Sequence, residues 1–95
     1  MAAFIVATVD INNPDGFRQY VRAIDGLSAS YGGEAIVKSE VTDVMEGDVA
    51  VGQRVVIIKF PTADAIKSYL SDRRYQAGKA KRAGAAKVDM RIVVD

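Results

Sequence analysis

Four tyrosines and one arginine are the residues whose types best suit a small-molecule site. They are Tyr20, Tyr31, Arg54, Tyr69 and Tyr75. A tyrosine offers a ring and a hydroxyl group, which suits an aromatic ligand, and an arginine can bind a carboxylate through two N–H groups. We take these five as candidate ligand-binding residues and assign no catalytic residue. The alternative is that the rings fill a small core and the hydroxyls reach water.

The chain has no histidine and no cysteine, which narrows its chemistry. Without cysteine there is no disulfide, thiol nucleophile or thiolate zinc site. Without histidine there is no Ser-His-Asp triad and no imidazole metal ligand. Any general base would have to be Asp, Glu, Lys or Tyr with a shifted pKa. We therefore expect no metal and no cofactor, and the sequence leaves open whether the protein is an enzyme.

Charge is unevenly distributed along a chain whose net charge is +1. Residues 1–50 hold three Lys or Arg against eight Asp or Glu, and residues 51–95 hold ten against four. A basic set lies late in the chain: Arg73, Arg74, Lys79, Lys81, Arg82 and Lys87. It could be a solvated face or a site for an anionic partner. Because only Tyr75 could stack on bases nearby, we expect no nucleic-acid binding.

Polar side chains also interrupt the apolar strands. They are Thr8, Asp10, Arg54, Lys59, Asp89 and Arg91. Buried charges need partners, so Asp10, Arg54 and Arg91 could pair across neighbouring strands. Alternatively, Arg54 and Arg91 could hold one ligand carboxylate.

The chain twice follows an apolar strand with a capped amphipathic helix. When segments 13–21 and 62–70 are aligned, Tyr20 falls on Tyr69, and Asn13 and Thr62 stand near the helix starts. Asparagine and threonine are good N-caps. The first apolar stripe runs to Tyr31, which predicts one helix from residue 14 to 31, weakened at Gly26.

The other elements follow from periodicity and from glycine and proline positions. We predict strands over 4–11, 35–41, 54–60 and 88–94. In one alternative, the strand that begins at residue 35 continues through Val44 and Met45. A second helix should end at Leu70, and a third, capped by Asp72, should cover 73–83. The order is that of a ferredoxin-like α+β fold, with a four-stranded antiparallel sheet and helices on one face, in a single domain over residues 1–95.

Both faces of the predicted sheet are apolar, and two main helices can cover only one of them. Phe4 and Ile5 point to opposite faces of the first strand, and the run 55–58 is apolar on both faces. The simplest cover for the second face is another copy of the chain, packed sheet on sheet. We therefore predict a homodimer.

Four segments resemble a family of small bacterial proteins catalogued as domain of unknown function 1330, within the dimeric α/β-barrel superfamily. They are Tyr31-Gly-Gly, Met45-Glu-Gly, Arg54-Val-Val-Ile-Ile-Lys-Phe-Pro and Tyr75-Gln-Ala-Gly-Lys-Ala-Lys-Arg. The resemblance implies a ferredoxin-like protomer and a homodimer. Superfamily relatives include cofactor-free quinone-forming monooxygenases, muconolactone isomerase and haem-dependent enzymes. The chain has Lys38-Ser-Glu40 where the family usually shows Arg-Gly-Gly, and Lys59 where it usually has Glu.

These observations favour a cytoplasmic homodimer that binds a small aromatic or acidic metabolite in a cleft between sheet and helices. One alternative is an enzyme resembling cofactor-independent monooxygenases or isomerases. Another is a non-enzymatic dimerising module whose cleft is filled by its own side chains. No segment is long and apolar enough to span a bilayer, and the apolar stretch 1–10 is too short for a secretory core and has no basic residues before it. We therefore expect a cytoplasmic protein with no membrane partner.

Overall fold

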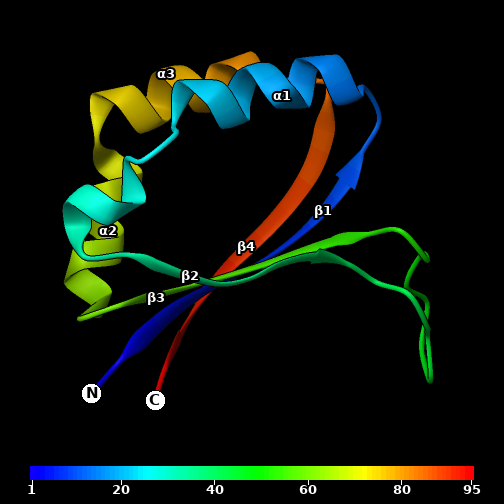
Figure 1. Cartoon of the computed structure of the whole chain (residues 1–95), viewed down its shortest axis with the longest axis horizontal. Coiled ribbons are helices and arrows are strands. Elements are labelled where there is room, and N and C mark those ends of the chain that lie inside the picture. Colours follow the sequence, from blue (N-terminus) through cyan, green and yellow to red (C-terminus); the bar gives the residue numbers. More distant parts are fainter.

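The computed structural model describes residues 1–95 and contains one four-stranded antiparallel sheet with its helices on one face (Figure 1). The strands are β1 (Ala3–Ile11), β2 (Glu34–Glu40), β3 (Arg54–Phe60) and β4 (Ala86–Val94), in the sheet order β2-β3-β1-β4. The helices are α1 (Pro14–Ala23), α2 (Ala63–Ser71) and α3 (Arg73–Lys81), with a short 3₁₀-helix, η1 (Ser28–Tyr31). The predicted ferredoxin-like arrangement is confirmed.

The repeated strand–helix unit is present with the predicted caps. The Asn13 side chain accepts hydrogen bonds from the N–H groups of Asp15 and Gly16, and Thr62 accepts one from Ala65. These bonds satisfy backbone donors that the first turn of a helix leaves free. The Asp72 side chain caps α3 in the same way, through the N–H of Arg74.

The first helix is shorter than its apolar stripe predicts. It ends at Ala23, and η1 follows after a turn. Gly26 adopts a left-handed backbone conformation with φ of 73°, which a residue without a Cβ tolerates. The turn redirects the chain so that Leu27 packs into the core, where its side chain is buried. The prediction of a continuous helix to Tyr31 was therefore wrong beyond Ala23.

The second strand ends at Glu40, so its alternative extension through Val44 and Met45 does not form. Residues 41–53, here called the β2–β3 arm, extend away from the helices (Figure 1). Val41 and Gln53 hold the base of the arm together, because the Val41 N–H donates to the Gln53 carbonyl at 2.8 Å.

Strand register separates two arginines that the sequence could not place. Arg54 pairs with Val9, a buried residue on the face that carries the helices. Arg91 pairs with Val6, on the opposite face. Successive side chains of a strand alternate between faces, so Arg54 and Arg91 lie on opposite sides of the sheet. The hypothesis that both hold one carboxylate was wrong.

Helix α1 is held mainly by α3, which lies beside it above the sheet (Figure 1). The contact centres on Gly78, where an added Cβ would come within 2.7 Å of Ile24 Cγ2 and 3.3 Å of Ala23 Cβ. The start of α1 is fixed separately, because the N–H groups of Asn12 and Asn13 both donate to the Ala85 carbonyl. The position of α1 is therefore set at its side and its start.

We expect Gly78→Val to lower the free energy of unfolding by about 1–3 kcal/mol, because the added methyl groups would overpack the contact with α1. Ala77→Val is the matched control, since Ala77 is exposed on the same helix and should lose only helix propensity, about 0.6 kcal/mol. Urea unfolding followed by circular dichroism measures both. Equal losses in the two variants would contradict the close α1–α3 contact.

Candidate functional site

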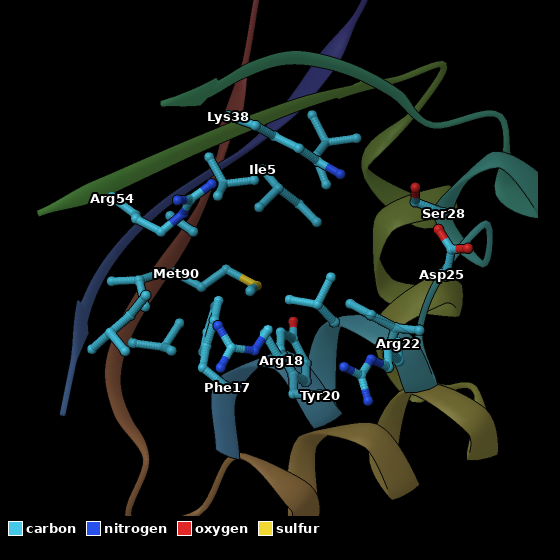
Figure 2. A pocket seen from close by; sticks show the side chains of 18 of the residues that line it. Ile5, Phe17, Arg18, Tyr20, Arg22, Asp25, Ser28, Lys38, Arg54 and Met90 are labelled. Atoms are coloured by element: carbon cyan, nitrogen blue, oxygen red, sulfur yellow. The ribbon is translucent and has the colours of Figure 1, made fainter. Parts of the chain in front are cut away.

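A cleft of about 770 Å³ lies between α1 and the helix-covered face of the sheet (Figure 2). Most of its lining residues are apolar. Ala7 stands in the middle of β1 on this face, paired with Val56 on one side and Met90 on the other. An alanine side chain fills little space, so the middle of this sheet face leaves room for the cleft. The chief apolar residues of the cleft are Ile5, Ala7, Phe17, Ile24, Val56 and Met90.

Charged side chains stand on two sides of this cleft (Figure 2). Lys38 and Arg54 extend from β2 and β3, and Arg18 and Arg22 extend from α1. The cleft is therefore an apolar space bordered by basic groups on its sheet wall and on its helix wall.

Two carboxylates also line the cleft, Asp25 after α1 and Glu40 on β2. Glu40 Oε1 lies 3.8 Å from Arg54 Nη1, and Arg18 pairs with Asp15 one turn earlier on α1. Lys38 has no carboxylate within 4.0 Å.

Tyr20 forms part of the α1 wall, and its hydroxyl faces the cleft (Figure 2). Its ring packs 5.4 Å from the ring of Phe17, and the Arg82 guanidinium lies 4.6 Å from its centroid. The hydroxyl donates to the Tyr75 hydroxyl at 3.5 Å, which is long for an O–H···O bond. Burial raises the pKa of Tyr20, so the phenol stays protonated at neutral pH.

Tyr69 also lines this cleft, and Tyr75 packs against Tyr69 without lining the cleft. Their ring centroids are 5.0 Å apart, and both side chains are buried. Burial raises the pKa of Tyr69 to about 12. The Tyr75 hydroxyl accepts a hydrogen bond from Arg82 Nη1 at 3.1 Å and does not line the cleft. Tyr20 and Tyr69 can therefore donate hydrogen bonds to a ligand, but they are poor general bases at neutral pH.

Tyr31 lies outside the cleft and has a structural partner. Its hydroxyl donates to Asp72 Oδ2 at 2.6 Å. The same carboxylate accepts hydrogen bonds from the side chain and the backbone of Arg74. The bonds from Arg74 and Tyr31 lower the pKa of Asp72, which keeps the carboxylate ionised. This network ties η1 to the junction between α2 and α3.

The structure therefore brings together Tyr20, Arg54 and Tyr69 and leaves Tyr31 and Tyr75 outside the cleft. Sequence reasoning missed Lys38, because its face depends on a register shift between Ala35 and Val37 in β2. Because this shift is not visible in the sequence, the alternation of side chains along a strand could not decide which side of the sheet Lys38 occupies. It also missed Arg22, which on a helix pattern alone looks like any solvated residue.

The basic residues of the later chain are dispersed rather than gathered into one site. Arg74 binds Asp72, Arg82 covers the Tyr20 ring, and Lys87 Nζ lies 4.0 Å from Asp89. No group of three or more carboxylates is placed to hold a metal ion. None of the helices combines the length and apolar character needed to cross a membrane.

The chain belongs to the family described as a domain of unknown function, DUF1330, which it matches over residues 2–95. Within this chain, the Lys38-Ser-Glu40 segment places Lys38 and Glu40 on the cleft. No curated protein gives a significant match to the sequence.

Several solved structures share this fold at low sequence identity. A protein of unknown function from Rhodopseudomonas palustris is 17% identical, with a TM-score of 0.75, over 97% of this chain and 80% of its own. A dimeric ferredoxin-like protein of unknown function from Jannaschia sp. CCS1 is 8% identical, with a TM-score of 0.74, over 100% of both chains. SnoaB, a cofactor-independent oxygenase from Streptomyces nogalater, is 10% identical, with a TM-score of 0.70, over 99% of this chain and 92% of its own.

Alkaline unfolding tests the environment of Tyr69. Its pKa is raised from 10.0 to about 12, so the stability that its neutral form contributes is complete below pH 10 and is lost as the pH rises toward 12. We expect Tyr69→Phe, which cannot ionise, to lose less stability than the wild type between these pH values. Chemical unfolding at a series of pH values measures the difference. Parallel pH profiles would contradict a buried, neutral Tyr69.

Proposed function

We propose that the protein is a cytoplasmic homodimer that binds a small aromatic or acidic metabolite in the cleft between α1 and the sheet. The observation that carries the proposal is the cleft itself. Its volume of about 770 Å³ falls within the range typical of small-molecule sites, roughly 300–1,000 Å³. Its lining is mostly apolar with a few polar groups, which is the usual composition of such sites.

The groups around the cleft match an aromatic or acidic ligand. Phe17, Tyr20 and Met90 provide rings and a polarisable thioether, all of which pack well against aromatic surfaces. Arg54 provides a guanidinium group, which suits a carboxylate. The fold is also that of SnoaB, a cofactor-independent oxygenase, so it is compatible with small-molecule chemistry in a relative.

The second face of the sheet supports the dimer. Phe4, Val6 and Ile57 are neighbours on this face, and none of them is fully buried in the isolated chain. Further apolar side chains adjoin them: Val37, Val55 and Val93. Lys59 and Arg91 stand beside Phe4 and Val6 on the same face. An exposed apolar surface bordered by charged residues is characteristic of an interface. The Jannaschia protein, which has the same fold, is described as dimeric, so we propose that a second copy covers this face.

Benzoate is a suitable first probe because it is both aromatic and acidic. In ¹H–¹⁵N NMR we expect saturable shifts at the amides of Phe17, Ile24 and Met90 as benzoate fills the cleft. Val56→Phe should abolish them, because the larger ring enters the cleft from β3, whereas Val56→Ile should retain them. Shifts that never saturate, or that lie on the other face of the sheet, would count against a ligand site here.

The dimer is tested by a single charge on the open face. We expect the wild type to sediment as a dimer at micromolar concentration and Ile57→Lys to sediment as a monomer, because the lysine would place an unpaired charge in an apolar interface. Ala77→Lys, on the exposed side of α3, should remain dimeric. A wild-type monomer would show that the face is uncovered.

A further inference from the structure

Basic side chains on both walls of the cleft lack a close carboxylate. On the helix wall, Arg18 is paired with Asp15, whereas Arg22 has no carboxylate within 4.0 Å. On the sheet wall, Lys38 has none within 4.0 Å, and Arg54 has only Glu40, at 3.8 Å. The sheet wall therefore holds two basic side chains and one carboxylate.

We infer that the ligand carries one carboxylate, held by Lys38 and Arg54, while its apolar body rests on Phe17, Ile24 and Met90. The inference builds on the proposed function and specifies the class of ligand as an aromatic or otherwise apolar carboxylic acid. Its carboxylate would offset the excess positive charge of the sheet wall, whereas a cation would meet Lys38 and Arg54 directly.

The geometry of Arg54 allows it to take this role. Its only ion pair joins Nη1 to Glu40 at 3.8 Å, which is longer than a charge-assisted hydrogen bond. The Arg54 side chain is 35% exposed, so it can meet a ligand without first being uncovered. Lys38 lines the same cleft from the neighbouring strand, and in Figure 2 its side chain runs toward Ser28, away from Arg54. Because a lysine side chain is flexible, it can turn toward a carboxylate held by Arg54.

The tyrosines of the cleft do not repel a ligand carboxylate in this position. Tyr20 and Tyr69 are neutral at physiological pH, because burial raises the pKa of each phenol. A phenolate would repel a carboxylate, whereas a protonated hydroxyl can donate to it. The long bond from Tyr20 to Tyr75 leaves this donor readily available to a polar group of the ligand.

Three ligands of similar shape distinguish the contribution of the ligand charge to binding from that of the aromatic ring: benzoate, benzamide and benzylammonium. We expect benzoate to bind the wild type roughly tenfold or more tightly than benzamide, the effect of gaining a charge-assisted hydrogen bond. Benzylammonium should bind most weakly. The preference for benzoate should decrease with added salt, because part of it is electrostatic attraction at a solvent-accessible wall.

Lys38→Gln and Arg54→Gln should each remove most of the benzoate preference while leaving benzamide binding unchanged. Lys67→Gln, an exposed lysine on α2, is the matched control and should bind like the wild type. Equal binding of benzoate and benzamide to the wild type would overturn this inference and leave the proposed binding function standing. An undiminished benzoate preference in both variants would overturn the assignment to Lys38 and Arg54. Failure of all three ligands to bind would refute the inference together with the proposed function.

Discussion

The contact between α1 and α3 at Gly78 is the interaction on which the cleft depends. In many sheet-and-helix folds, a helix packs its apolar stripe directly on the sheet, and no space remains between them. Here α1 packs against α3, and an added Cβ at Gly78 would come within 2.7 Å of Ile24 Cγ2. Phe17 on α1 and Ile24 directly after it line the cleft.

The strands complete this arrangement through their alternation. One face carries Ala7 and Val56 under the helices, and small side chains at the centre of this face leave the cleft unfilled. The other face carries Phe4, Val6 and Ile57, which no helix of the chain covers. A single sheet thus has one apolar face toward the cleft and another that is open. Binding and self-association can therefore occupy separate sides of the same four strands.

Sequence alone was sufficient for most of the fold. The caps at Asn13 and Thr62 and the apolar strands are local signals, and local signals determine where elements begin. The break at Gly26 was harder, because the apolar stripe continues past it and tertiary packing of Leu27 decides the outcome. The sheet face occupied by Arg91 could not be predicted from the local sequence, since it depends on strand register.

The site was less predictable than the fold for the same reason. Tyr20, Arg54 and Tyr69 could be proposed from residue type, because rings and guanidinium groups suit a ligand wherever they meet. Which tyrosines reach the cleft depends on tertiary packing, in which Tyr75 packs against Tyr69 and does not line the cleft. Lys38 enters the site only because β2 carries an irregular register.

A crystal structure of the protein grown with benzoate would show whether the cleft holds a ligand. We expect an open space between α1 and the sheet, with the benzoate ring between Phe17 and Met90 and its carboxylate toward Lys38 and Arg54. A structure in which Phe17 and Ile24 pack directly on Ala7 and Val56, leaving no space for a ligand, would contradict this expectation.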